Sequence, residues 1–224
     1  MIPWDEWESL EQLRGLIFDC DGVLFDSFQS NVGYYNAILA EIGMGPMSPK
    51  QAEYVHTHTV TQSLAHIAGL ERVEEALSMR FKVDYNEVAL PYLQPESGLY
   101  ELLDWLMNQG VRMGVSTNRT TTMDRVVAYY DLGKYFFPVM TASNSRAKPS
   151  PEGVYTILDS WGYAPEEVAY IGDSDVDRKT ALAADVPFWA YKNPKLKARV
   201  HVDDFWKLRR VLNEAFSGGR NPLV

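Results

Sequence analysis

Short apolar runs alternate with helix-like segments through most of the chain, and this alternation constrains the fold more than any other feature. The apolar runs are residues 16–18, 111–115, 137–141, 168–171 and 187–191. Helical patterns flank the later runs, at residues 97–110, 121–130, 150–162, 176–184 and 203–216. Strands and helices that alternate at this spacing predict an α/β fold with a parallel sheet. Because crossovers between parallel strands are right-handed, the carboxyl ends of all strands should meet at one edge.

Residues 28–96 interrupt the alternation, because they contain helical patterns alone. One apolar helix face recurs at i, i+3, i+4 and i+7, through Tyr35, Ile38, Leu39 and Ile42. We therefore predict two domains. Residues 1–27 and 97–224 form a Rossmann-like core, an open parallel sheet with helices on both faces, and residues 28–96 form an inserted α-helical domain.

The composition narrows the class of partner. The chain has 224 residues, 46% of them hydrophobic, and a formal net charge of −9. That charge disfavours a nucleic acid or an anionic membrane as partner. One cysteine fits a reducing compartment, and the acidic start of the chain does not resemble a signal peptide, so we expect a cytoplasmic protein. Trp4, Trp7 and Leu10 could pack on the core or form a dimer contact, which leaves monomer and dimer both open.

A pair of carboxylates follows the first strand, in Asp19-Cys20-Asp21-Gly22. Side chains alternate along an extended strand, so Asp19 and Asp21 should point the same way and Cys20 should be buried on the other side. Ligands bind at the carboxyl ends of strands in open α/β sheets. The two carboxylates could act as nucleophile and acid/base, or could hold a cation.

The other strands bring further polar residues to the same edge. They are Thr117 and Asn118 after the second strand, Lys148 after the third, and Asp173, Asp175 and Asp177 after the fourth. A carboxylate nucleophile, a hydroxyl, a lysine and an acidic cluster suit phosphoryl transfer through an aspartyl phosphate with a divalent metal. Mg²⁺ and one lysine would offset most of the charge of a phosphate dianion beside two aspartates.

Four motifs in this order resemble those of the haloacid dehalogenase superfamily of phosphatases. They are Asp19-x-Asp21-Gly22-Val23-Leu24-x-Asp26-Ser27, Thr117-Asn118, Lys148-Pro149 and Gly172-Asp173-Ser174-x-x-Asp177. The resemblance covers essentially the whole length. The helical insertion resembles the helical (C1-type) cap of the phosphoglycolate phosphatase and β-phosphoglucomutase branch.

The resemblance implies a role for each motif residue. Asp19 would attack phosphorus, and Asp21 would protonate the leaving oxygen and then activate water. Thr117, Asn118 and Lys148 would bind the phosphate, with Ser116 as the competing hydroxyl. Magnesium would bind the Asp19 carboxylate, the Asp21 backbone carbonyl and Asp173. Asp177 would help to orient these ligands without binding the metal itself.

The implied activity is that of a Mg²⁺-dependent phosphomonoester hydrolase acting on a small phosphorylated metabolite, with phosphoglycolate the first candidate. The alternative within the branch is a β-phosphoglucomutase-like sugar phosphomutase, although Asn31 stands where such mutases often carry a histidine. A catalytically silent binding module is the alternative of another class. His56 and His58, in a polar stretch between two helical patterns, are the candidates for substrate contact, followed by Arg72, Arg80 and Lys82.

Overall fold

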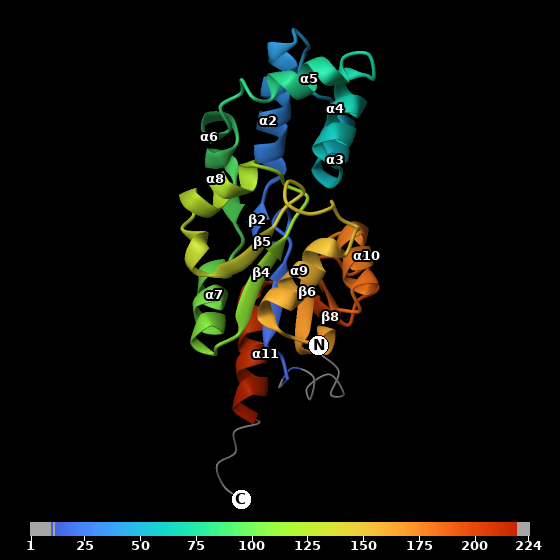
Figure 1. Cartoon of the computed structure of the whole chain (residues 1–224). Coiled ribbons are helices and arrows are strands. Elements are labelled where there is room, and N and C mark those ends of the chain that lie inside the picture. The colour runs from blue at the N-terminus through green and yellow to red at the C-terminus, as the bar shows by residue number, and fades with distance from the viewer. Residues whose placement is uncertain (1–9, 11, 219–224) are drawn as a thin grey trace, which may run out of the picture. The chain divides into compact units, whose positions relative to one another are not determined.

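The computed structural model describes residues 10 and 12–218 (Figure 1). The chain divides into two compact units. One consists of the residues up to Leu24 and from Pro95 onward, and the other is Phe25–Gln94. Trp4 and Trp7 of the expected N-terminal stripe lie outside the described residues, whereas Leu10 is buried.

The first unit is built on a parallel sheet, as the sequence predicts. Within the described residues the sheet has six strands in the order β5-β4-β1-β6-β7-β8, and every neighbouring pair is parallel. Their bounds are β1 Gly15–Phe18, β4 Arg112–Ser116, β5 Phe136–Met140, β6 Val168–Gly172, β7 Phe188–Tyr191 and β8 Val200–Val202. Strand β8 is not predicted from the sequence, because three residues at a sheet edge are too short to show a period.

Helices cover both faces of this sheet, and neighbouring residues of β1 face different layers. The helices are α7 Leu99–Asn108, α8 Thr122–Tyr129, α9 Glu152–Trp161, α10 Asp175–Ala183 and α11 Phe205–Gly218, with short 3₁₀ turns at Leu132–Lys134 and Pro165–Glu167. Ile17 belongs to a core cluster with residues of α9 and α10. Phe18 instead contacts Phe205 of α11, edge to face, at a centroid distance of 6.3 Å. The sheet is therefore buried on both sides.

Two strand glycines leave room for the tryptophan of α9 against the sheet. A Cβ atom on Gly15 would lie 2.5 Å from the Trp161 ring, and one on Gly114 would lie 3.0 Å from it. The indole N–H of Trp161 donates a hydrogen bond to the carbonyl of Phe137 at 2.8 Å. These contacts hold α9 against β1, β4 and β5. The loop that precedes α9 carries Lys148.

The second unit is helical. It contains α2 Phe28–Glu41, α3 Pro49–Thr57, α4 Val60–Ala68, α5 Val73–Met79, α6 Tyr85–Val88 and a 3₁₀ turn at Leu90–Tyr92. The two-residue strands β2 Phe25–Asp26 and β3 Gln94–Pro95 pair where the chain passes between the units. Gly43, with φ of 71°, follows the end of α2, and Ser48 caps α3 in a capping box with Gln51.

The polar stretch at residues 56–59 joins two helices through a break of two residues, His58 and Thr59. His56 lies in the last turn of α3, His58 is its C-cap, and Thr59 already caps α4. The reason is local, because Thr59 and Gln62 form a capping box that starts α4 at once. The His56 ring lies 3.3 Å from the Asn31 amide, and the His58 ring stacks on Tyr54 at 3.7 Å.

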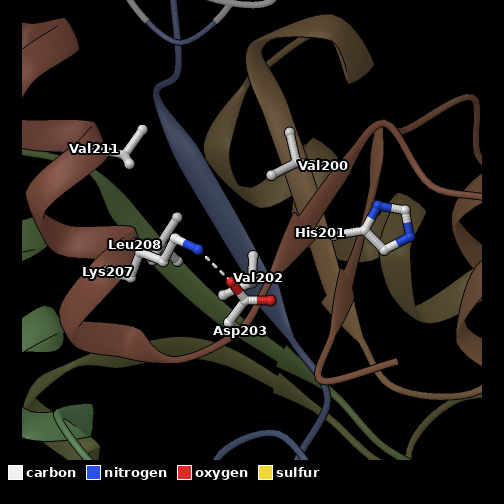
Figure 2. A pocket seen from close by; sticks show the side chains of 7 residues that line it. All are labelled: Val200, His201, Val202, Asp203, Lys207, Leu208 and Val211. Carbon is white, nitrogen blue, oxygen red and sulfur yellow. Dashed lines mark hydrogen bonds and ion pairs between the residues drawn. The ribbon is translucent and has the colours of Figure 1, made fainter. Parts of the chain in front are cut away.

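A small cavity of about 40 Å³ lies at the β8 edge of the sheet (Figure 2). It is lined by Val200, His201, Val202, Asp203, Lys207, Leu208 and Val211, which are separate from the predicted site residues. Among the described residues, no helix combines the length and the apolar character needed to cross a bilayer.

Candidate active site

Asp19 lies directly beyond the carboxyl end of β1, in the centre of the sheet. Its N–H donates to the carbonyl of Ile171 at 2.9 Å, which continues the pairing with β6 by one residue. The nearly buried carboxylate accepts the N–H of Cys20 at 2.7 Å and pairs with the ammonium of Lys148 at 2.8 Å. The next residue, Cys20, is buried as expected, and burial raises the pKa of its thiol.

Lys148 is the cation of this site, and its side chain is only 5% exposed. Its Nζ lies 2.8 Å from Asp19 and 2.5 Å from Asp177, so it bridges the two carboxylates. Its backbone is held by the carboxamide of Asn118, whose Oδ1 accepts the Lys148 N–H at 2.7 Å and whose Nδ2 donates to the Lys148 carbonyl at 3.3 Å. Both polar atoms of the Asn118 side chain thus contact the backbone of Lys148 and help to position this lysine.

Asp177 has both carboxylate oxygens occupied. Oδ2 accepts the N–H of Ser174 at 3.1 Å and its hydroxyl at 2.5 Å, in the capping box that begins α10. Oδ1 receives Lys148 and lies 3.2 Å from the hydroxyl of Tyr170. The Tyr170 hydroxyl also lies 3.0 Å from the carbonyl of Ser116. This set of contacts suits a carboxylate that orients its neighbours.

Asp19, Asp173 and Asp177 form an acidic group, in which one carboxylate oxygen from each lies within 4.8 Å of the others. Asp173 reaches the group because Gly22 has no side chain, since a Cβ there would lie 2.2 Å from Asp173 Oδ2. Gly22 also adopts φ of 75°, which a residue with a Cβ rarely adopts. An all-oxygen donor set of this kind fits Mg²⁺.

Burial controls the electrostatics of this group. Burial, and then the charge of Asp177, raises the pKa of Asp173 to about 7. The same two causes raise the pKa of Asp19, although Lys148 opposes them. Burial disfavours the ammonium of Lys148, but Asp177 and Asp19 outweigh it and raise its pKa well above the usual value. One ammonium thus faces three carboxylates, and a divalent cation would relieve the excess negative charge.

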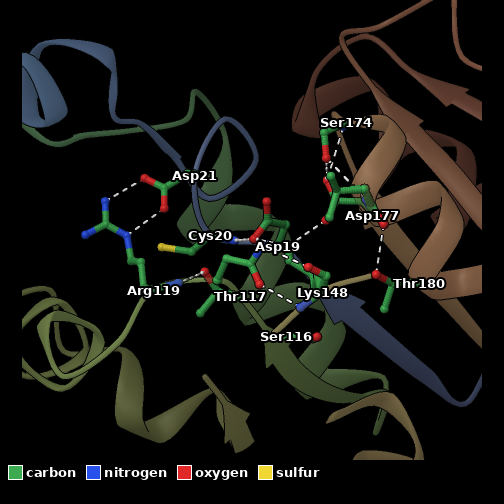
Figure 3. Close-up of polar contacts among 12 residues, drawn as sticks. Asp19, Cys20, Asp21, Ser116, Thr117, Arg119, Lys148, Ser174, Asp177 and Thr180 are labelled. Atoms are coloured by element: carbon green, nitrogen blue, oxygen red, sulfur yellow. Dashed lines mark hydrogen bonds and ion pairs between the residues drawn. The ribbon is translucent and has the colours of Figure 1, made fainter. Parts of the chain in front are cut away.

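Asp21 does not join this group, which corrects the expected common direction of Asp19 and Asp21. Strand β1 ends at Phe18 and the chain turns after Asp21, so strand alternation does not extend to these two residues. Figure 3 shows the Asp21 carboxylate directed toward Arg119, while Asp19 lies beside Lys148. Arg119 donates from Nε to Asp21 Oδ2 at 2.8 Å and from Nη2 to Oδ1 at 2.6 Å.

Arg119 is a site residue that the sequence reasoning missed. It directly follows the Thr117-Asn118 motif, and its position after a strand end was the available signal. Its side chain is only 7% exposed, and its N–H donates to Thr117 Oγ1 at 3.2 Å. The hydroxyl of Ser116, the competing candidate, lies beside Gly153 of α9. Its Oγ is 3.6 Å from the position that a Cβ on Gly153 would take. Of the two candidate hydroxyls, it is therefore Thr117 whose oxygen accepts the backbone N–H of Arg119.

Asp175 stands outside the acidic group. It lies in the first turn of α10 and pairs with Arg178 and Lys179 at 2.6 and 2.8 Å. The structure thus brings together in one unit the predicted residues Asp19, Asp21, Thr117, Asn118, Lys148, Asp173 and Asp177, whereas His56 and His58 belong to the helical unit.

Comparison with known proteins agrees with this fold. The model of the haloacid dehalogenase-like hydrolase family matches residues 16–191, and the chain belongs to this family. The match spans the end of the sheet at which Asp19, Lys148 and Asp173 meet.

Individual relatives share between about a quarter and two fifths of their residues with this chain. Phosphoglycolate phosphatase 1 of Pseudomonas aeruginosa is 28% identical over 77% of this chain and 67% of its own length. Phosphoglycolate phosphatase of Aquifex aeolicus is 26% identical over 86% of this chain and 91% of its own length. The crystal structure of a HAD-superfamily hydrolase, subfamily IA, variant 1, from Geobacter sulfurreducens is 38% identical, with a TM-score of 0.75 over 90% of this chain and 97% of that one.

Proposed function

We propose that the chain is a Mg²⁺-dependent phosphatase that hydrolyses a small phosphomonoester through an aspartyl phosphate on Asp19. The observation that carries the proposal is the buried ammonium of Lys148, held between Asp19 and Asp177 at 2.8 and 2.5 Å. A cation fixed beside a carboxylate nucleophile lowers the repulsion that the nucleophile exerts on an incoming phosphate dianion.

In this proposal an oxygen of Asp19 attacks phosphorus while Asp21 gives a proton to the leaving oxygen. Asp21, now a carboxylate, then takes a proton from the water that attacks the phosphorus, and the bond to Asp19 breaks. The Thr117 hydroxyl and the backbone N–H groups of its loop bind phosphoryl oxygens, and Lys148 balances their charge. The same pair of carboxyl groups thus serves both half-reactions.

Mg²⁺ fits the acidic group, and Asp19, Asp173 and the Asp21 backbone carbonyl are the residues that would hold it. It would supply charge stabilisation for the transferring phosphoryl group. Asp177 would orient the residues around the metal and not bind it, because its oxygens already accept hydrogen bonds from Ser174 and Lys148.

For the substrate we propose phosphoglycolate as the first candidate, because the relatives from Pseudomonas aeruginosa and Aquifex aeolicus are phosphoglycolate phosphatases. Residues 28–96 would act as the cap that selects the leaving group, with His56 and His58 as candidate contacts. A reducing, cytoplasmic location fits the single cysteine of the chain.

A panel of phosphorylated metabolites, assayed for phosphate release with and without Mg²⁺, tests the proposal. We expect release that depends on Mg²⁺, stops with EDTA and is absent in Asp19→Asn. A sugar phosphate that is isomerised without net phosphate release would instead support the phosphomutase alternative. Wild-type turnover by Asp19→Asn would remove the aspartyl phosphate from the mechanism.

A further inference from the structure

The guanidinium of Arg119 holds both oxygens of the Asp21 carboxylate. The two contacts measure 2.8 and 2.6 Å and run from adjacent donors of one planar group. Such a two-point contact fixes the orientation of a carboxylate as well as its position. The pair is also shielded, because the side chain of Arg119 is 7% exposed and that of Asp21 is 23% exposed.

The backbone of Arg119 is anchored on both sides, so the guanidinium projects from a fixed point. Its N–H donates to the Thr117 hydroxyl at 3.2 Å, and its carbonyl accepts the N–H of Ala142 at 2.9 Å. Thr117 itself is tied to the sheet, since its N–H donates to the Met140 carbonyl at 3.0 Å. The loops after β4 and β5 together therefore carry Arg119.

The two carboxylates of the Asp19-x-Asp21 motif consequently have different cationic partners. Asp19 pairs with Lys148 and belongs to the acidic group, whereas Asp21 pairs with Arg119. A carboxylate two residues from a cation site would otherwise be free to turn toward that cation and become a ligand.

We propose that Arg119 is the positioning residue for the general acid/base. It keeps the Asp21 carboxyl group out of the acidic group and oriented for proton transfer, and when Asp21 carries its proton on one oxygen, the other oxygen still accepts from Arg119. This inference rests on the proposed function, in which Asp21 gives its proton to the leaving oxygen and later takes one from water. Arg119 acts only through Asp21 and exchanges no proton itself.

The test is a double-mutant cycle that follows phosphoenzyme formation in single turnover, with a phosphate ester of a poor leaving group and with p-nitrophenyl phosphate. Arg119→Met should slow the reaction of the alkyl ester by about a hundredfold and that of p-nitrophenyl phosphate by less than about tenfold, because a good leaving group needs little acid help. In the Asp21→Asn background, Arg119→Met should change either rate by less than about threefold, since the group that it positions is gone.

Arg119→Lys should recover part of the alkyl-ester rate, because an ammonium keeps the charge and one of the two contacts. Arg14→Met is the matched control, since Arg14 also pairs with a carboxylate, Glu167 at 2.8 Å, but is exposed. It should leave both rates unchanged. If Arg119→Met does not fold by circular dichroism and thermal unfolding, Arg119→Gln replaces it in the cycle.

Equal losses from Arg119→Met with and without Asp21, or equal losses for both substrates, would overturn the inference and make Arg119 a phosphate or structural contact. An unchanged or faster alkyl-ester reaction in Arg119→Met would overturn it as well. Failure of the proposed function looks different, because Asp19→Asn would then remain active whatever stands at position 119.

Discussion

At the scale of single residues, the site separates two carboxylates that lie only two positions apart. Asp19 has Lys148 as its partner and Asp21 has Arg119. Under the proposed function, one carboxyl group forms a bond to phosphorus and the other moves protons. Two different cations at two different loops allow each carboxyl group to keep its own orientation.

The first prediction concerns the nucleophile. Asp19→Asn should lower phosphate release by about a thousandfold or more, because an amide cannot form the acyl phosphate. Phosphate binding should survive, since one negative charge is removed next to Lys148. Turnover assays and isothermal titration with inorganic phosphate measure the two effects. Loss of binding together with turnover would point to a folding defect instead.

The second prediction concerns Asn118, whose side chain holds the backbone of Lys148. Asn118→Ala should lower kcat by roughly ten- to a hundredfold, because a displaced Lys148 ammonium stabilises the charge of the transition state less well. The control is Asn213→Ala on the exposed surface of α11, which should keep wild-type kcat. A wild-type kcat in Asn118→Ala would show that Lys148 is held well enough without the carboxamide.

At the scale of elements, the position of α9 depends on two strand residues that are glycines and therefore leave space for its tryptophan. Trp161 lies on Gly15 of β1 and Gly114 of β4, where added Cβ atoms would come within 2.5 and 3.0 Å of its ring. The loop before α9 carries Lys148, so the packing of this helix also bears on the site.

The third prediction tests this packing. Gly15→Ala should destabilise the protein by about 1–3 kcal/mol, because the new methyl group overpacks a buried interface. Gly45→Ala is the matched control, since nothing lies within 4 Å of its added Cβ, and it should have little effect. Urea unfolding followed by fluorescence gives both free energies. Equal stability of the two variants would mean that Trp161 moves aside at little cost.

At the scale of the whole molecule, the acidic group couples stability to pH and to metal. The pKa of Asp173 is about 7, against an ordinary value of 3.8. A raised pKa means that the folded state binds the proton more tightly than the unfolded state does. Its contribution to stability is therefore complete below about pH 4 and is lost as the pH rises toward 7.

The fourth prediction follows from the loss of the Asp173 proton as the pH rises. Mg²⁺ competes with protons for the carboxylates, so it should raise Tm by several degrees near pH 8 and by less near pH 6. Thermal unfolding with Mg²⁺ and with EDTA at both pH values measures the difference. A larger Mg²⁺ effect near pH 6 would contradict the assignment of this group as the cation site.

The fifth prediction concerns the division of labour between the units. If the helical unit selects the substrate, His56→Ala or His58→Ala should change the ranking of substrates by kcat/KM. Hydrolysis of p-nitrophenyl phosphate should remain nearly unchanged, because it needs little recognition. His201→Ala, in β8 of the other unit, serves as the control. Equal losses on every substrate would move selection to other residues of the helical unit, with Arg72, Arg80 and Lys82 as the next candidates.

The sequence by itself determined the α/β architecture and the residues that gather at one edge of the sheet. Apolar runs and helical periods depend on local burial, and the order of the strands along the chain limits the topologies available. The positive φ of Gly22 and Gly43 was similarly readable, because only a residue without Cβ adopts it at little cost. Family membership followed from the same motifs.

Only the tertiary structure decided which partner each polar side chain takes. The pairing of Asp21 with Arg119 joins residues 98 positions apart, and the bond of Asn118 to Lys148 joins residues 30 positions apart. No local pattern encodes such pairs, because they depend on where β1, β4 and the loop after β5 come to lie in the sheet. Strand alternation failed at Asp21 for a related reason, since the point at which a strand ends is set by its neighbours.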